Sequence, residues 1–402
     1  MAHSSSPQHW QKTLEQIDTL LYEHVLLWRA EDCRDHQNAK QQPRYSALFH
    51  RLQQFDDRDV QRLQADDHAL LEALQSVFPP AAEIARLIQL PMTPQVAAAE
   101  PPTGLSGKKW QQVQAFLNAQ AAPGDTVIEW CCGKGLIGEA LSISPHFSPS
   151  RHIHGLDIDA QLVAAGNQRA SASRQPRQLH CCDVLSDASD HWLAQADSVL
   201  ALHACGGLHQ RLLTRSCALG VGHIVLSPCC YHRFIRDYKP LSERLRASPL
   251  TLSTADLRLA VRQTATARRG EHEARRQLHR WHLASQQLAA RWGVSLARYR
   301  SLPHSAAKQG FEAFLTQQLA ANQLAARQPN NAERDAALQQ ASDQQRDQEQ
   351  RGLAAMLFRR LLEMRCVLDS VVYLEEQSYS VNLKSFCATQ LSPRNLIISA
   401  SR

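Results

Sequence analysis

The spacing of apolar residues divides the chain into a helical first part and a second part in which strands and helices alternate. Over residues 8–90, apolar side chains such as Leu14 and Ile17 recur every three or four positions between polar ones, which is the pattern of amphipathic helices. Residues 91–107 then contain four prolines and two glycines, and such a cluster of helix breakers predicts a boundary. We therefore expect residues 1–95 to form a helical accessory region.

From residue 108 the pattern changes to short apolar runs, several of which are separated by helical segments. Strands that alternate with helices predict a parallel sheet covered by helices on both faces, which is the α/β class. We expect this core to occupy residues 104–262. Its predicted strands are Thr126–Trp130, His152–Asp157, Gln178–Asp183, Ser198–His203 and His223–Ser227.

The last third of the chain begins with a basic stretch and ends with further core elements. Nine arginines and two acids lie between Arg262 and Arg300, in an Ala/Gln/Leu-rich background, so we expect residues 263–352 to be a basic helical insertion. Within it, residues 328–351 are almost wholly polar and predict a loop or an exposed helix. Residues 353–402 are expected to return to the core as a helix and two closing strands, at 381–387 and 395–399.

Composition and charge narrow the classes of function. Hydrophobic residues make up 44% of the 402 residues, but no run approaches the ~20 apolar residues of a membrane-spanning helix. The first residues lack the pattern of a signal peptide, so we expect a cytoplasmic protein without a membrane partner. Residues 1–100 carry 9 Lys and Arg against 14 Asp and Glu, and the remainder carries 35 against 24. A net charge of +11 after residue 100 fits a polyanionic partner such as RNA.

The clearest chemical motif is TVIEWCCGKGLIG at residues 126–138, which predicts a strand ending in an acid, a glycine-containing turn and the start of a helix. Gly133 and Gly135 let the backbone turn tightly beside a ligand, and the amides at the helix start favour electronegative groups. Asp157 and Asp183 follow at the ends of the next two predicted strands, where a carboxylate can accept the hydroxyls of a ribose. Together they indicate a nucleotide-type pocket.

The turn is Cys-Cys-Gly-Lys-Gly and not the dinucleotide signature G-x-G-x-x-G, and the constellation resembles that of class I S-adenosylmethionine (SAM)-dependent methyltransferases. The motifs GKG, LHACGGL (202–208) and SPCCYHR (227–233), with GLSGKKWQQV and LSPRNLII, resemble one family in particular. That family contains tRNA 2′-O-methyltransferases of the acceptor stem, glutathione S-transferase C-terminal-domain-containing proteins and uncharacterised methyltransferase-like relatives. The similarity covers residues 104–262 and 353–402, and it implies a Rossmann-like sheet, SAM as cofactor and methyl transfer as the reaction.

The resemblance also implies roles for individual residues. Glu129, Gly133 and Gly135 would contact the methionine part of SAM, Asp157 its ribose and Asp183 its adenine. The residues that would line the pocket at the end of the fourth strand are His203, Ala204 and Cys205. One departure from the family pattern is Cys131, which stands where most class I enzymes carry the first glycine of the turn.

Cysteines gather at the predicted carboxyl ends of four strands, which is the ligand edge of an open α/β sheet. Three interpretations are open: small apolar packing residues, ligands of a metal ion or iron–sulfur cluster, or a nucleophile of the kind used by RNA cytosine-5 methyltransferases. The chain has no Cys-x2-Cys pair, so we favour packing and expect no metal. The cysteines concerned are Cys131, Cys132, Cys181, Cys182, Cys205, Cys229 and Cys230.

Methyl transfer needs mainly an aligned acceptor in a dry pocket, and the candidates for a catalytic role are His203, Tyr231 and His232. Either histidine has an ordinary pKa suited to a general base for a hydroxyl acceptor, and the sequence does not choose between them. SPCCYH also resembles the [DNS]-P-P-[FY] signature of amino-group methyltransferases, but it follows the fifth strand and not the fourth.

RNA is the expected substrate, and no obligatory protein partner is inferred. Two alternatives to an RNA methyltransferase are open. One is an enzyme that methylates a protein or small molecule, and the other is a non-catalytic RNA-binding or assembly factor.

Overall fold

The computed structural model describes residues 7–29, 39, 41–94, 100–102, 106–119, 124–143, 151–262, 269–296 and 302–402. The chain forms two compact units. Unit 1 combines Met1–Glu31, Pro80–Arg262 and Leu357–Arg402, and unit 2 combines Asp32–Pro79 with Gln263–Met356. The expected accessory region 1–95 thus contributes helices to both units.

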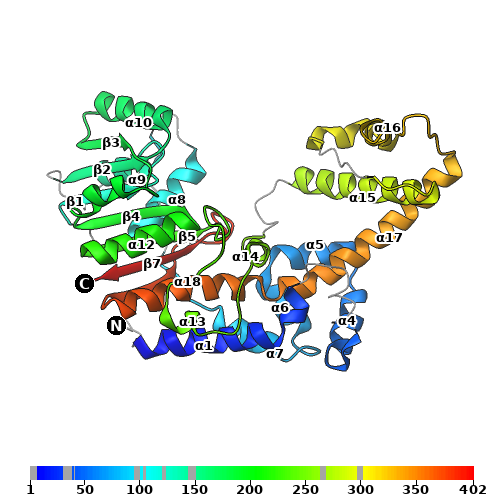
Figure 1. Cartoon of the computed structure of the whole chain (residues 1–402), viewed down its shortest axis with the longest axis horizontal. Helices are drawn as coiled ribbons and strands as arrows, with labels where there is room; N and C mark the ends of the chain where they lie inside the picture. Colours follow the sequence, from blue (N-terminus) through cyan, green and yellow to red (C-terminus); the bar gives the residue numbers. More distant parts are fainter. Residues whose placement is uncertain are drawn as a thin grey trace. The chain divides into compact units, whose positions relative to one another are not determined.

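A seven-stranded sheet forms the centre of unit 1, in the order β3-β2-β1-β4-β5-β7-β6 (Figure 1). Strands β1 to β5 are mutually parallel, and β7 runs antiparallel to both of its neighbours. This confirms the predicted α/β sheet with its two late closing strands. The strands are β1 (Thr126–Trp130), β2 (His152–Asp157), β3 (Arg177–Cys181), β4 (Ser198–Cys205), β5 (His223–Cys229), β6 (Ser380–Ser385) and β7 (Leu396–Ser401).

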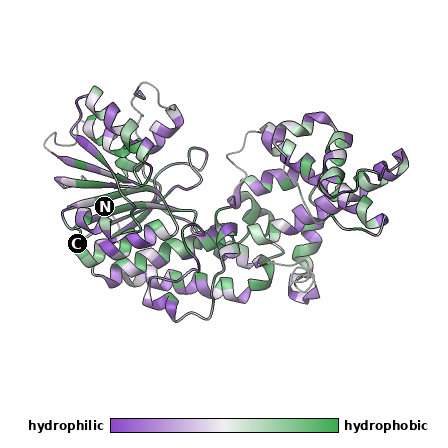
Figure 2. Cartoon of the chain, turned by 45° about the horizontal axis from the view of Figure 1, so that its top comes forward, coloured by the Kyte–Doolittle hydropathy of each residue, from purple (hydrophilic) through white to green (hydrophobic). Residues whose placement is uncertain are grey.

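Both faces of the sheet are buried at its central parallel strands, as is usual for parallel sheets. On one face, residues such as Val127, Leu200 and Ile397 join helices α8 (Gly107–Asn118) and α9 (Leu136–Ile143) in one apolar cluster. The alternate positions, including Val199 and Leu226, are fully buried as well. Helices α12 (Gly207–Leu219) and α18 (Arg359–Glu376) pack against strands of the sheet. The central strands of the sheet carry hydrophobic residues (Figure 2) and are almost wholly buried, as in β1, β4 and β5.

The helices of unit 1 lie before, between and after the strands. Among the described residues, no helix combines the length and apolar character needed to cross a membrane. The helices are α1 (Pro7–Glu23), α2 (Val25–Trp28), α7 (Pro80–Leu87), α8 (Gly107–Asn118), α9 (Leu136–Ile143), α10 (Ala160–Ala172), η2 (Asp187–Ser189), α11 (Asp190–Leu193), α12 (Gly207–Leu219), α13 (Glu243–Arg246), α14 (Thr254–Ala260) and α18 (Arg359–Glu376).

Helix α18 is buried along almost its whole length, and its polar residues connect the chain segments of unit 1. The Asp369 carboxylate accepts hydrogen bonds from the backbone amides of Leu241 and Ser242, each at 2.9 Å, and from the Ser242 hydroxyl at 2.7 Å. Arg365 donates to Asp18 of α1 at 2.7 Å. A buried carboxylate and guanidinium are stable only when paired in this way, so α18 fixes both α1 and the loop that precedes α13.

Unit 2 is helical in its described residues, and its centre is the pair α15 (Arg269–Arg291) and α17 (Asn331–Met356). Ala337 and Ala341 of α17 are fully buried, and they share one apolar cluster with Leu283 and Leu288 of α15. Of the polar stretch 328–351, residues 331–351 therefore lie in a helix, and the expectation of a loop is wrong for them. The alternative, an exposed helix, needs one correction, because the helix has a buried alanine face. The elements are η1 (Pro43–Tyr45), α4 (Ser46–Gln53), α5 (Asp57–Ala65), α6 (Asp67–Leu74), α15 (Arg269–Arg291), η3 (His304–Gln309), α16 (Phe311–Ala321) and α17 (Asn331–Met356).

Candidate functional site

The strand order reverses between β1 and β4, and in open α/β sheets ligands bind outside the carboxyl ends of the strands at such a point. The turn after β1 reaches this edge. Cys131, Gly133 and Gly135 all have positive φ, at 53°, 56° and 70°. Cys131 thus adopts the left-handed backbone that a glycine adopts at lower cost.

The two glycines of the turn have different surroundings. A Cβ atom added to Gly133 would meet no atom within 4 Å, whereas one added to Gly135 would lie 3.0 Å from Arg177 and 3.1 Å from Leu179. Gly133 therefore faces open space that a cofactor can fill, and Gly135 permits close packing of the turn against β3. Both were predicted to contact the cofactor, and Gly133 is the one with room for it.

Asp157 lies at the end of β2, directly beside this turn. Its Oδ2 accepts a hydrogen bond from the Gly133 amide at 2.8 Å, and its Oδ1 accepts one from the Asp159 amide at 3.0 Å. A carboxylate has about four lone-pair sites, so two remain for a diol such as the ribose of a nucleoside. The next residue, Ile158, exposes 68% of its surface, which offers an apolar contact for a base.

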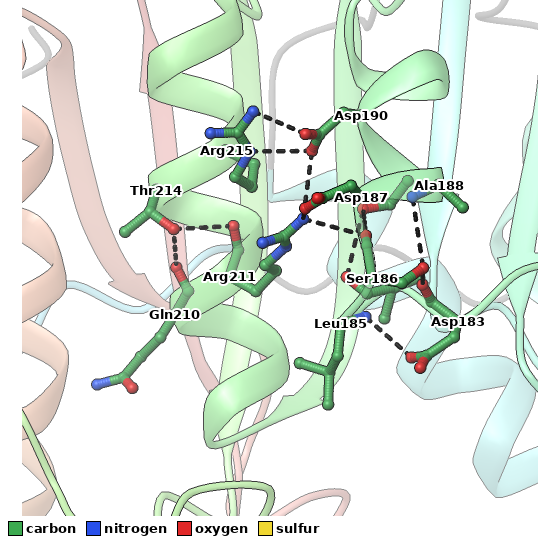
Figure 3. Close-up of polar contacts among 12 residues, drawn as sticks. Asp183, Leu185, Ser186, Asp187, Ala188, Asp190, Gln210, Arg211, Thr214 and Arg215 are labelled. Carbon is green, nitrogen blue, oxygen red and sulfur yellow. Dashed lines mark hydrogen bonds and ion pairs between the residues drawn. The ribbon is translucent and has the colours of Figure 1, made fainter.

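Asp183 follows β3 and lies in a loop held by α12 (Figure 3). Its main-chain carbonyl accepts from the Ser186 amide at 3.0 Å, and Arg211 of α12 donates to the Ser186 carbonyl at 3.0 Å. Arg215 forms a bidentate pair with Asp190, at 2.9 and 2.7 Å. The Asp183 side chain is exposed, so the loop is fixed while its carboxylate stays accessible to a ligand.

Glu129, at the end of β1, is 3% exposed. Its two carboxylate oxygens accept hydrogen bonds from the amides of Ile137 and Gly138, at 3.1 and 2.7 Å. Burial raises the pKa of Glu129 to about 7, although these two hydrogen bonds oppose the rise. Glu129 thus holds the start of α9 against β1, and a direct contact with the cofactor's methionine part stays a prediction.

This environment makes stability depend on pH. In the unfolded chain Glu129 ionises near its ordinary value of 4.5, whereas the folded chain keeps its proton up to about pH 7. The folded state therefore binds the extra proton, and the free energy of unfolding should fall by up to about 3 kcal/mol as the pH rises through this window. In Glu129→Gln the free energy of unfolding should fall less between pH 5 and pH 7.5, and urea titrations at these two pH values would measure the difference. If the free energy of unfolding fell equally in both proteins, its pH dependence would not come from Glu129.

The predicted catalytic residues lie at the ends of β4 and β5. His203 has a φ of 67°, is half-buried, and contacts the Gln112 amide of α8. Burial, with the charge of Lys109 nearby, lowers the pKa of His203 to about 4. The imidazole is therefore neutral at pH 7, where it can accept a hydrogen bond but is a weaker base than an ordinary histidine. The neighbouring Ala204 is buried and Cys205 is half-buried.

Tyr231 and His232 differ in their access to a substrate. Tyr231 is 2% exposed and packs edge-to-face on His209, with ring centroids 5.9 Å apart. A substrate cannot stack on a ring this buried, so the geometry gives no support to a catalytic role for Tyr231, which stays a prediction. His232 is half-exposed, and its pKa is lowered by partial burial and by the positive charges of Arg258, Arg233 and Arg394.

The motifs LHACGGL and SPCCYHR interlock at this edge. The Gly206 amide donates to the Cys229 carbonyl at 3.0 Å, and the Gly207 amide donates to the Arg233 carbonyl at 2.9 Å. A Cβ atom on Gly207 would lie 2.0 Å from the carbonyl oxygen of Phe234. The two glycines therefore allow the loop after β5 to approach the start of α12, which explains why the two motifs occur together.

The sequence reasoning did not assign roles to Lys109, Gln112 and Arg394. All three lie at this edge and act on His203, by charge or by hydrogen bond. Lys109 and Gln112 belong to the motif GLSGKKWQQV and Arg394 belongs to LSPRNLII, so these two motifs are the sequence signal for them.

Comparisons with known proteins agree with this geometry. Residues 108–237 match the family model of a methyltransferase domain. A glutathione S-transferase C-terminal domain-containing protein homolog from Drosophila pseudoobscura pseudoobscura is 28% identical over 131 residues, which is 31% of this chain and 20% of that protein. The Xenopus laevis protein of the same description is 26% identical over 145 residues, or 34% and 22%. The matches thus span about a fifth of these relatives' length.

Among solved structures, the cyclopropane synthase MmaA2 from Mycobacterium tuberculosis aligns over 88% of this chain and 96% of its own, at 12% identity and a TM-score of 0.25. So low a score carries no argument, and the assignment rests on the family model and on the strand order of this sheet. The comparisons thus show a match to a methyltransferase domain over residues 108–237, the part of the chain that contains the parallel strands β1 to β5.

Proposed function

We propose that this chain is a SAM-dependent methyltransferase that acts on RNA. The cofactor part of the proposal is carried by the open space at Gly133 beside the two free acceptor sites of Asp157. SAM fits the residues present, since its amino-acid part can lie along the glycine turn, its ribose at Asp157 and its adenine between Ile158 and the loop of Asp183. When bound, it supplies a methyl group on a positively charged sulfur.

The chain's own residues would bind and orient the acceptor. In methyl transfer the acceptor's lone pair forms the new bond to carbon while the carbon–sulfur bond breaks, and any proton on the acceptor leaves to a base. The neutral imidazole of His203 can accept a hydrogen bond from an acceptor hydroxyl and orient it. Burial of Ala204 and Tyr231 beneath the edge helps to keep water out of the site.

RNA as substrate is supported by the positive charges at the acceptor side of the site. Lys109, Arg233, Arg258 and Arg394 come from α8, the loop after β5, α14 and the segment before β7, and their charges act on His203 or His232. Cations from four separate elements that converge on one edge suit a phosphate backbone, which contributes much of the affinity in RNA binding.

Two arginines of α15, Arg275 and Arg276, already have partners within unit 2. Arg276 pairs with Glu349 at 2.6 Å and lies 3.5 Å from Asp57, and Arg275 donates to His304 at 3.0 Å. Arg268 and the side chain of Arg269 lie outside the described residues. Arg276 thus has a structural partner, and a phosphate contact by this stretch stays a prediction.

The test is methylation of RNA prepared from cells that lack this protein, with SAM labelled on its methyl group. We expect label in material that ribonuclease degrades and protease does not, and mass spectrometry of the nucleosides identifies the methylated atom. Lys109→Gln with Arg233→Gln should reduce the labelling tenfold or more and flatten its salt dependence, while SAM binding persists. Label in protease-sensitive material only, or none despite bound SAM, would contradict RNA as the substrate.

A further inference from the structure

Three cysteine sulfurs converge where β4 and β5 end. Cys205 and Cys229 are direct partners in the register of these strands, and their sulfurs lie 3.3 Å apart. Cys230 joins them, so that all three Sγ atoms lie within 4.8 Å of one another. Within the described part of the chain, this is the one such group of three or more Cys, His, Asp or Glu side chains.

The backbone brings adjacent cysteines to the same place. In an extended strand, successive side chains point to opposite faces, which is why a Cys-Cys pair seldom supplies two ligands to one ion. Here Cys230 has a φ of 44°, and its carbonyl accepts from the Arg233 amide at 2.8 Å in a tight turn. This left-handed residue costs roughly 1 kcal/mol, and it directs the Cys230 sulfur back toward those of Cys229 and Cys205.

We propose that Cys205, Cys229 and Cys230 bind a single thiophilic metal ion of the zinc class. In a tetrahedral zinc site with sulfur ligands at about 2.3 Å, the sulfurs lie about 3.8 Å from one another. Here the Cys205 and Cys229 sulfurs are 3.3 Å apart, and no pair of the three exceeds 4.8 Å. The charges of Lys109, Arg233 and Arg394 act on these sulfurs and offset the negative charge of three thiolates. In iron–sulfur clusters of four irons, each cysteine binds a separate iron, so this close grouping suits one ion better.

The site has three protein ligands, and its fourth position is open. Cys229 is 3% exposed, but Cys205 and Cys230 are each half-buried, so one side of the group faces the carboxyl edge of the sheet. Structural zinc sites are closed by four protein ligands, whereas sites with three keep a place for an exogenous ligand. We infer that the fourth ligand is water or a small thiol. The inference does not rest on the proposed function.

The experiment uses the full chain, purified anaerobically with a non-thiol reductant and then titrated with Co²⁺ as a spectroscopic substitute for zinc. We expect about one equivalent bound, with a thiolate-to-cobalt charge-transfer band and the visible bands of a tetrahedral site. Zinc should displace the cobalt. An added small thiol should increase the charge-transfer band as it takes the open position, and an unchanged spectrum would show that the position is closed.

Each of Cys205→Ser, Cys229→Ser and Cys230→Ser should weaken cobalt binding at least tenfold and reduce the charge-transfer intensity. Cys217→Ser is the matched control, because Cys217 is a buried cysteine of α12 outside the group, and it should bind cobalt as the unchanged protein does. Circular dichroism shows whether each variant folds. Three results would overturn the proposal. They are absence of cobalt binding in the folded protein, cobalt binding by the three variants as tight as that of the unchanged protein, and a Cys205–Cys229 disulfide under these reducing conditions.

Discussion

Replacement of Asp157 by alanine is expected to lower the affinity for SAM about a hundredfold. The carboxylate has two acceptor sites that the protein does not use, and each hydrogen bond from a ribose hydroxyl to a charged group contributes about 1.5 kcal/mol or more. Two such bonds amount to about 3 kcal/mol, and each 1.4 kcal/mol is a factor of about ten. The same substitution frees the Gly133 amide, which loosens the turn as well.

Titration calorimetry with SAM measures this effect, and Asp159→Ala is the matched control. The Asp159 carboxylate caps α10 by accepting from the amides of Gln161 and Leu162, at 2.9 and 3.1 Å. Its loss should cost about 1 kcal/mol of stability and leave SAM binding nearly unchanged. If Asp157→Ala bound SAM as tightly as Asp159→Ala does, the ribose assignment would be wrong.

Gly207→Ala should reduce the free energy of unfolding by about 3 kcal/mol or more. The added Cβ would lie 2.0 Å from the backbone carbonyl oxygen of Phe234, and a backbone atom cannot move aside as the end of a side chain can. Forced expansion of a packed region costs about 1–3 kcal/mol, and the hydrogen bond from the Gly207 amide to Arg233 would be strained as well. The loop that carries the substrate-side residues would then shift.

Chemical denaturation of Gly207→Ala and of the unchanged protein tests this expectation, and Gly222→Ala is the control. A Cβ on Gly222 would meet only the Asp197 carbonyl, at an ordinary contact distance of 3.4 Å, so this variant should unfold within about 0.5 kcal/mol of the original. Equal stability of the two variants would show that the loop after β5 yields at little cost.

The positions of the core strands along the chain could be predicted because their signals are local. Strands such as Thr126–Trp130 are short apolar runs bounded by turn residues, and the predicted sheet with its two late strands is confirmed. The strand-end acids and glycines could be located for the same reason, since parallel strands bring their carboxyl ends to one edge. Gly133 and Asp157 indeed lie together there.

Other features depend on contacts that no local pattern records. Ala337 and Ala341 are buried because α17 packs on α15, although their neighbours in sequence are mostly Gln, Asp and Arg. Tyr231 is buried because the loop after β5 turns inward beside His209. The convergence of Cys230 with Cys229 depends on one backbone torsion, and a residue other than glycine gives no warning of a positive φ.

The discontinuous make-up of unit 1 has a consequence for its synthesis on the ribosome. Strand β5 ends at Cys229, and its partner β7 begins at Leu396. At roughly 5–20 residues per second, the edge of β5 waits on the order of ten seconds for the strand that covers it. An apolar strand with an open edge can pair with other chains during that time. The growing chain should therefore need protection from aggregation, by chaperones or by slow initiation, until its last strands emerge.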